Sequence, residues 1–330
     1  MTHTGFQAAS LARGLGRVRA AGAWASRDEV IMGTAIRVEL WSDERAAGEA
    51  AIDAVMAEMH RIDRAMSPHK PDSELSRINR DAATQAVSLS EEMCQLLACA
   101  IEFSDLSGGA FDITHASVGQ LYDYRRGLRP DAAALARGRA AIGWRGLELD
   151  PKARTLRFAR EGMRIDLGGF AKGHAVESAA AILRGHGIRH AIVTAGGDSR
   201  LLGDRRGRPW SVAIRDPRRP EEVVAVLPLE DCAVSTSGDY ERYFERDGVR
   251  FHHVIDPKTG RSPSSVHSVT ILADDGLTSE ALSKSVFVLG VDKGLQLVES
   301  LPGVDAVVVD AAGALHYSAG LLAGAVSPRQ

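Results

Sequence analysis

The spacing of hydrophobic residues predicts a chain in which helices and strands are mixed. Alternation in "VIMGTAIRVELW" at 30–41 predicts a strand, and the hydrophobic residues after it recur at helical spacing. That helical face consists of Ile52, Val55, Met56, Met59 and Ile62. The pattern predicts further helices at about 90–105, 176–185 and 278–289. It also predicts a short helix capped by Ser73.

The second half of the chain is richer in predicted strands. They lie in "HAIVTAGGD" (190–198), "PWSVAIRDP" (209–217), "CAVSTSGDY" (232–240), "RYFERDGVRFHHVID" (242–256), "SVTILA" (268–273) and "DAVVVD" (305–310). Strands and helices do not alternate regularly, which favours an α+β fold over a doubly wound parallel sheet. No low-complexity linker divides the chain, so we expect one compact domain over residues 29–325.

The composition is that of an ordinary globular protein. Hydrophobic residues make up 45% and charged residues 25% of the 330 residues, which excludes a disordered or fibrous chain. The net charge of -3 provides no basic field, so we expect no nucleic-acid partner. The three cysteines, Cys94, Cys99 and Cys232, form no C-x-x-C pair and are odd in number. They therefore predict neither a disulfide framework nor a cysteine metal site.

The N-terminal stretch, residues 1–28, is expected to be a loose tail. Arg13, Arg17 and Arg19 interrupt it where a secretory signal would need an unbroken apolar segment, and no lipobox cysteine is present. No run approaches the roughly 20 apolar residues of a membrane helix, so we expect no transmembrane segment. These features predict a cytoplasmic protein, with a periplasmic location open if the start codon is misassigned.

The stretch "RIDLGGFAKGHAVE" at 164–177 combines a predicted strand end, two glycines, a lysine and a helix start. Such a turn exposes backbone N–H groups at the positive end of a helix dipole, and Lys172 adds a cation. Gly168 and Gly169 let a ligand approach the backbone closely. The stretch matches neither the P-loop nor the dinucleotide fingerprint. Two interpretations stay open, a phosphate site and a tight turn with a solvated lysine.

Seven motifs occur in an order that closely resembles the ApbE family of FAD:protein FMN transferases, from about residue 31 to 320. They are "MGT" (32–34), "PDSELSRIN" (71–79), "GGAFDIT" (108–114), "IDLGGFAKG" (165–173), "AGGD" (195–198), "STSGDY" (235–240) and "HHVIDPKTG" (252–260). The resemblance implies two α/β subdomains with an FAD cleft between them. It also implies transfer of FMN from FAD to a Thr or Ser hydroxyl of a target flavoprotein, with release of AMP.

The resemblance also implies the site residues. The expected reacting groups are Lys172, which would neutralise phosphate charge, and His253, which would act as a base. The residues expected to bind the nucleotide are Met32, His69, Asn79, Asp166, Gly168, Gly169, Lys172, Gly197, Asp198, Ser237 and Asp256. His69 stands where the family often has a tyrosine beside the flavin.

A second departure concerns the metal. Family members usually bind Mg²⁺ through an aspartate and a threonine four residues apart, with a backbone carbonyl that maps to Ala171. This chain has Glu280 and Lys284 at those two positions. Glutamate is still an oxygen ligand, whereas an ammonium has no lone pair to offer. Two interpretations remain, an i,i+4 ion pair and an ammonium that replaces Mg²⁺ as the diphosphate's counter-charge.

Three hypotheses follow for function. The first is an FMN transferase with FAD as donor and a flavoprotein subunit as acceptor. The others are a non-catalytic FAD-binding protein and an FAD pyrophosphatase. The sequence carries no signal for the acceptor's identity or for an oligomeric state.

Overall fold

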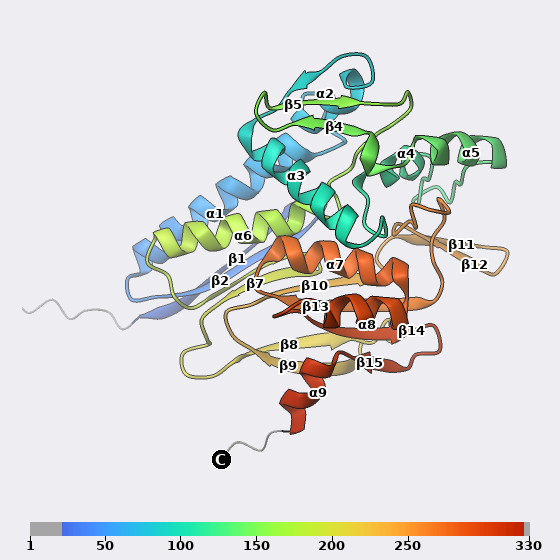
Figure 1. The fold of residues 1–330 in the computed structure, drawn as a ribbon. Coiled ribbons are helices and arrows are strands. Elements are labelled where there is room, and N and C mark those ends of the chain that lie inside the picture. Colours follow the sequence, from blue (N-terminus) through green and yellow to red (C-terminus); the bar gives the residue numbers. More distant parts are fainter. Residues whose placement is uncertain (1–21, 327–330) are drawn as a thin grey trace, which may run out of the picture.

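The computed structural model describes residues 22–326, with an antiparallel sheet of eight strands at its centre (Figure 1). The strand order is β1-β2-β6-β7-β10-β13-β14-β15. These strands are β1 (Ala23–Ile31), β2 (Thr34–Ser42), β6 (Ala191–Ala195), β7 (Asp198–Leu202), β10 (Ala233–Gly238), β13 (Val266–Ala273), β14 (Asp305–Asp310) and β15 (Leu315–Tyr317).

Four helices lie over this sheet: α1 (Arg45–Met66), α6 (Ala171–Gly185), α7 (Gly276–Leu289) and α8 (Val291–Glu299). The predicted stripe of α1 from Ile52 to Ile62 is buried and forms part of the largest core, together with residues of β2, β6 and α6. Residues of α7, α8, β13 and β14 form a second core. The helical periodicities therefore identified the packed faces correctly.

A second group of elements forms the upper part of Figure 1. It contains α2 (Glu74–Asp81), α3 (Glu91–Leu106), η1 (Ile113–His115), α4 (Ala116–Gly119), α5 (Ala132–Ala141), η2 (Trp144–Gly146) and a small sheet of β3 (Val87–Ser88), β5 (Thr155–Phe158) and β4 (Leu147–Asp150). The Ser73 side chain caps α2, as predicted, by accepting a hydrogen bond from the Ser76 amide. Sheets and helices in this arrangement confirm the α+β fold.

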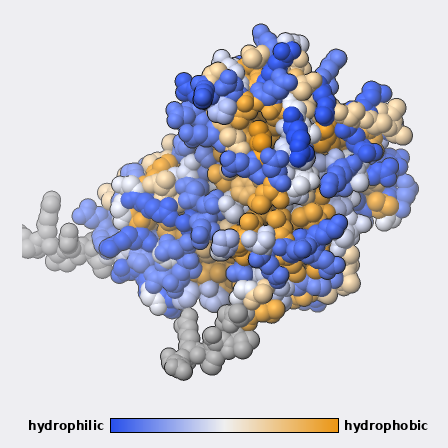
Figure 2. Space-filling model, viewed as in Figure 1, coloured by the Kyte–Doolittle hydropathy of each residue, from blue (hydrophilic) through white to orange (hydrophobic). Residues whose placement is uncertain are grey.

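Two separate hairpins and a final helix complete the structure. The hairpins are β8 (Trp210–Arg215) with β9 (Val223–Leu229) and β11 (Tyr243–Arg246) with β12 (Val249–His252), and the helix is α9 (Ala319–Val326). The pattern analysis did not predict β15 and α9. On the surface, hydrophobic residues form an interrupted band over α3, α7 and α8 (Figure 2). Within residues 22–326, no helix combines the length and the apolarity needed to cross a bilayer.

Two predictions near the N-terminus were wrong. The single strand at 30–41 is a hairpin, because Met32 and Gly33 adopt left-handed conformations with φ of 55° and 69° and reverse the chain. A methionine rarely adopts positive φ, so the pattern carried no turn signal there. The predicted tail extended to residue 28, but β1 begins at Ala23 because it pairs with β2 along its whole length. The rest of that tail, 1–21, lies outside the described residues.

Helices α6 and α7 cross with their backbones in contact at two glycines. A Cβ atom on Gly173 would lie 2.2 Å from the carbonyl oxygen of Gly276, and one on Gly276 would lie 2.4 Å from that of Gly173. Neither backbone can yield without moving a helix. The crossing matters for function because α6 carries Lys172 and α7 carries Glu280 and Lys284.

Gly173→Ala is therefore expected to lower the free energy of unfolding by about 1–3 kcal/mol or more, the cost of overpacking a tight contact. Urea denaturation measures the effect. Gly185→Ala, at the open end of the same helix with no atom within 4 Å of the new Cβ, is the control and is expected to stabilise by up to ~1 kcal/mol. Equal effects of the two substitutions would contradict the contact.

Candidate functional site

A cavity of about 490 Å³ lies between residues 68–169 on one side and 242–288 on the other. This volume lies in the range of small-molecule sites. Seven of the residues singled out in the sequence line it: His69, Asn79, Asp166, Gly168, Gly169, His253 and Lys284. Its wall also contains Arg164, Arg242, Tyr122 and Tyr124, which sequence reasoning missed. Three cations, Arg164, Arg242 and Lys284, make the wall suitable for an anionic ligand.

The segment 164–167 beside the cavity is extended but belongs to no strand, contrary to the predicted strand end. Its backbone is held instead by the Asn79 side chain. The Asn79 Oδ1 accepts from the Ile165 amide and the Asn79 Nδ2 donates to the Ile165 carbonyl, both at 2.8 Å. The next amide, of Asp166, donates to the carbonyl of Ile113. A side-chain amide thus replaces the partner strand and places the glycine turn against the cavity.

Asn79→Asp tests this bridge, because a carboxylate cannot donate to the Ile165 carbonyl and would repel it. We expect a loss of about 1–3 kcal/mol in the free energy of unfolding, the cost of leaving a buried polar group unpaired. Urea denaturation at neutral pH measures it. Gln85→Glu makes the same chemical change at an exposed position and is expected to change stability by less than ~0.5 kcal/mol. An unchanged free energy of unfolding in Asn79→Asp would show that the fold does not need this bridge.

Behind the glycine turn lies a buried cluster of two lysines and two carboxylates. The Lys172 Nζ bonds to both Asp198 and Glu280, whose side chains are 2% and 0% exposed. The second oxygen of Glu280 accepts from the Gly173 amide at 2.7 Å. The ammonium of Lys172 therefore faces protein carboxylates, and Lys172 does not line the cavity.

The electrostatics of this cluster follow from burial and close opposite charge. Burial works against the charged form of Lys172, but Asp198 and Glu280 outweigh it, so the pKa of Lys172 is raised. Burial, followed by the charge of Asp198, raises the pKa of Glu280. Burial also lowers the pKa of Lys284. Each charge is thus acceptable in this position only because its opposite lies beside it.

Lys284 occupies a different position in the same cluster. Its Nζ lies 3.8 Å from Glu280 Oε1 and donates to Ser283 Oγ at 3.2 Å. Its methylene groups lie over Gly169, where an added Cβ would meet Lys284 Cε at 3.5 Å. Lys284 also lines the cavity. The predicted i,i+4 pair with Glu280 is thus present in the structure, and the same ammonium reaches the cavity wall.

The remaining predicted residues lie away from the cavity wall. They are Met32, Ala171, Lys172, Gly197, Asp198, Ser237, Asp256 and Glu280. Met32 packs against the core, and the Ser237 hydroxyl bonds to that of Ser283 at 2.7 Å. A Cβ on Gly197 would lie 2.5 Å from the Thr236 carbonyl, so this glycine permits close strand packing. Asp256 closes a turn by accepting from the Lys258 amide at 2.9 Å.

The residues at the family's metal position do not fit a magnesium ion. Glu280, the one carboxylate at that position, already accepts hydrogen bonds from Lys172 and Gly173. Lys284, which stands where the threonine ligand would be, brings a positive charge within 3.8 Å of the same carboxylate. Within residues 22–326 no three His, Cys, Asp or Glu side chains are grouped to hold a metal. Two ammonium groups thus occupy the surroundings that a dication would need.

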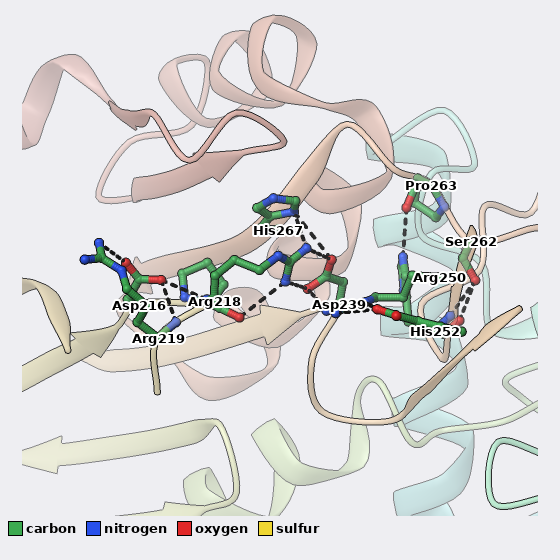
Figure 3. A network of polar contacts seen from close by, with 11 residues as sticks. Asp216, Arg218, Arg219, Asp239, Arg250, His252, Ser262, Pro263 and His267 are labelled. Atoms are coloured by element: carbon green, nitrogen blue, oxygen red, sulfur yellow. Dashed lines mark hydrogen bonds and ion pairs between the residues drawn. The ribbon is translucent and has the colours of Figure 1, made fainter. Parts of the chain in front are cut away.

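His253 follows β12 directly, and a polar network holds that strand (Figure 3). Asp239, at the end of β10, accepts from Arg218 through both oxygens at 2.7 and 2.5 Å and from Arg250 at 3.4 Å. His252 donates its amide to Ser262 Oγ at 2.9 Å, and Ser262 donates to the His252 carbonyl at 2.6 Å. Asp239, in the motif "STSGDY", therefore helps to position the strand before His253.

The imidazole of His253 lies at the cavity wall with its Nδ1 buried and without a hydrogen-bond partner among the described residues. Burial and then the charge of Lys284 lower the pKa of His253 to about 3. The ring is therefore neutral near pH 7, and its nitrogen lone pair can accept a hydrogen bond from a hydroxyl group. An unpaired polar atom at a cavity wall is also a site where a ligand or water completes the hydrogen bonding.

Aromatic rings form another part of the wall. Tyr122 and Tyr124 lie nearly parallel, with ring centroids 5.8 Å apart and planes at 5°. Tyr124 also contacts Phe244 on β11. The Tyr124 hydroxyl is buried without a partner among the described residues. The tyrosines come from the segment 120–124, whose sequence "QLYDY" has no periodic pattern to mark it.

Comparison with known proteins identifies many relatives. Residues 32–308 match the family model described as "ApbE family". The chain is 34% identical over 316 residues to the FAD:protein FMN transferase of Treponema pallidum, spanning 90% of this chain and 87% of that protein. It is 35% identical over 282 residues to the enzyme of the same name from Haemophilus influenzae, spanning 81% of each.

Solved structures show the same similarity. The crystal structure of the ApbE protein from Thermotoga maritima has a TM-score of 0.85 and 32% identity, and the match covers 91% of this chain and 99% of that one. The flavin transferase ApbE from Vibrio cholerae has a TM-score of 0.81 and 26% identity, covering 92% and 99% of the two chains.

Proposed function

Since this chain belongs to the ApbE family, we propose that it transfers FMN from FAD to a Thr or Ser hydroxyl of a target flavoprotein and releases AMP. The observation that best supports this function is the composition of the cavity. The lining of the cavity brings together the Gly168–Gly169 turn, the cations Lys284, Arg164 and Arg242, and the neutral imidazole of His253. Phosphoryl transfer depends on positive charge around the phosphate oxygens and on a positioned nucleophile.

The bond changes define what the residues must do. The acceptor's hydroxyl oxygen attacks the phosphorus on the FMN side of the diphosphate and forms a new phosphoester bond. The bond from that phosphorus to the bridging oxygen breaks, and AMP leaves with this oxygen. The hydroxyl proton passes to the neutral imidazole of His253. The cavity cations stabilise the charge that builds on the phosphate oxygens.

Different residues of the cavity bind different parts of FAD. Lys284, Arg164 and Arg242 attract the diphosphate, and the glycine turn lets it come close to the backbone. Tyr122 and Tyr124 provide flat aromatic surfaces suited to a ring system such as the flavin or the adenine. The buried carboxylates Asp198 and Glu280 act indirectly, by holding α6 and β7 around Lys172.

The test incubates the purified protein with FAD and a candidate flavoprotein subunit. The proposed function predicts fluorescent flavin that stays on the denatured acceptor, together with one AMP per flavin transferred. Acceptor subunits with the target Ser or Thr changed to Ala are the control and should remain unlabelled. AMP without labelled acceptor would indicate hydrolysis of FAD instead. Bound FAD with neither product would indicate a flavin-binding protein.

A further inference from the structure

The two lysines of the cluster differ in how many of their N–H groups are left without a hydrogen bond to the protein. Lys172 donates to two carboxylates and lies behind the cavity wall. Lys284 has a single hydrogen bond within the described residues, to Ser283, and lines the cavity. Two of the three N–H groups of Lys284 are thus available to a ligand. The sequence left both lysines as candidates for the diphosphate's cation, Lys172 at the glycine turn and Lys284 in place of Mg²⁺, and the geometry favours Lys284.

The surroundings of Lys284 hold its ammonium at one place. Its stem packs over Gly169, Ser283 accepts from its Nζ, and Glu280 attracts it from 3.8 Å. A buried side chain with these three restraints loses little further freedom when an anion binds. The ammonium is therefore a pre-positioned charge beside the glycine turn, on the same cavity wall as His253.

We propose that the Lys284 ammonium replaces the divalent cation in this chain and is the counter-charge for the diphosphate, so that FAD binding and transfer do not depend on Mg²⁺. The identity of the ligand as FAD rests on the proposed function. The cluster formed by Lys172, Lys284, Asp198 and Glu280 has two positive and two negative charges and is neutral as it stands. Among the described residues, the one oxygen of the cluster's two carboxylates without a hydrogen bond is Asp198 Oδ1. A dication bound there would still be repelled by the ammonium groups of Lys172 and Lys284.

Alternatives within the site are weaker. Arg164 and Arg242 also line the cavity, but no ion pair between either guanidinium and a carboxylate is present within residues 22–326. Asp166 is an acidic residue of the wall, and its Oδ1 accepts from the Gly168 amide at 2.8 Å. Asp112 also lines the cavity, but its oxygens already accept from Thr114 and from the Trp144 amide. Neither carboxylate provides the octahedral oxygen set that Mg²⁺ requires.

The test measures FAD binding by flavin fluorescence, in EDTA and in millimolar Mg²⁺. The wild type is expected to bind equally in both. Lys284→Met is expected to weaken binding at least ~10-fold, the loss of one charge-assisted hydrogen bond, with no recovery in Mg²⁺. Lys293→Met, which removes an exposed lysine on α8 outside the cavity, is the matched control and should bind like the wild type.

Two further variants keep the test decisive if Lys284→Met folds poorly. Lys284→Arg retains the charge and should retain most of the affinity. The double variant Glu280→Asp with Lys284→Thr restores the family's metal pattern. It should bind FAD weakly in EDTA and regain affinity in Mg²⁺. Circular dichroism and urea denaturation confirm that each variant is folded.

The outcomes separate this inference from the proposed function. Loss of wild-type affinity in EDTA with recovery in Mg²⁺ would overturn the role of Lys284, as would wild-type affinity in Lys284→Met. Metal-independent FAD binding that needs Lys284, with no AMP and no labelled acceptor, would support the cation's role and refute the transferase. Failure of the folded wild type to bind FAD in either condition would refute both.

Discussion

Lys172→Met is expected to lower the free energy of unfolding by about 3–5 kcal/mol, the cost of removing one partner from a buried ion pair. The Lys172 ammonium is the direct partner of both Asp198 and Glu280, which are almost completely buried. Without it, two carboxylates face one another, and Lys284 is the one remaining cation paired with either of them among the described residues, 3.8 Å from Glu280. Urea denaturation of the wild type and the variant measures the difference.

The deficit of Lys172→Met should depend on pH in a definite direction. Burial and Asp198 already raise the pKa of Glu280, and removing Lys172 raises it further. A carboxyl group whose pKa is higher in the folded state stabilises the fold at low pH and loses that contribution as pH rises through the folded pKa. The deficit should therefore be larger at about pH 8 than at about pH 5.

A double-mutant cycle provides the control for Lys172→Met. Glu280→Gln added to Lys172→Met removes the uncompensated charge while keeping an acceptor for the Gly173 amide, so it should recover part of the loss. Non-additivity of about 0.5–3 kcal/mol is expected for groups in contact. Equal stability of Lys172→Met and wild type at pH 8 would show that the carboxylates do not need this lysine.

His253→Ala is expected to slow transfer of FMN to the acceptor about 10²–10⁴-fold, the usual contribution of a general base. FAD affinity should change much less, since the imidazole is uncharged and contributes no ion pair to the diphosphate. Single-turnover labelling of the acceptor measures the rate, and flavin fluorescence measures binding. His186→Ala, at an exposed histidine beyond the end of α6, should leave both unchanged.

The pH profile of transfer tests the environment of the His253 imidazole. Burial and Lys284 hold the pKa of His253 at about 3 in the free protein. Protonation of this ring should therefore cause no fall in kcat/KM between about pH 8 and pH 5. A falling limb near the ordinary histidine pKa of about 6.5, present in the wild type and absent from His253→Ala, would contradict this environment.

The periodic patterns predicted most of the elements and the residues that form the core. The stripe from Ile52 to Ile62, the Ser73 cap and the strands around "AIVTA" and "VTILA" are confirmed by α1, α2, β6 and β13. These predictions were correct because each of these features depends on residues that are close together in the chain. The hairpin at Met32 was missed, because a left-handed methionine has no periodic signature. The strand end predicted at Ile165 was wrong, because this segment bonds to a side-chain amide from α2 and not to another strand.

The family resemblance named several residues that line the cavity, but not all of them and not what each one contacts. His69, Asn79, Asp166, Gly168, Gly169 and His253 line the cavity, and their roles in binding stay predictions. Arg164, Arg242 and the two tyrosines were missed. The arginines begin stretches that the sequence analysis quoted, 164–177 and 242–256, but no pattern distinguishes an arginine at a cavity from a solvated one. The tyrosines lie in a segment without a periodic pattern. Their meeting is a product of the packing of residues 68–169 against 242–288.

The sequence by itself determined the fold class and the family, and it supplied the two lysines and two carboxylates that form the cluster. Only the tertiary structure decided which lysine pairs inward and which faces the cavity. Lys172 and Lys284 are more than a hundred residues apart, and their positions depend on α6 and α7 crossing at Gly173 and Gly276. The sequence gives the charge of each residue. The fold decides which opposite charge lies beside it, because electrostatic interactions act through space.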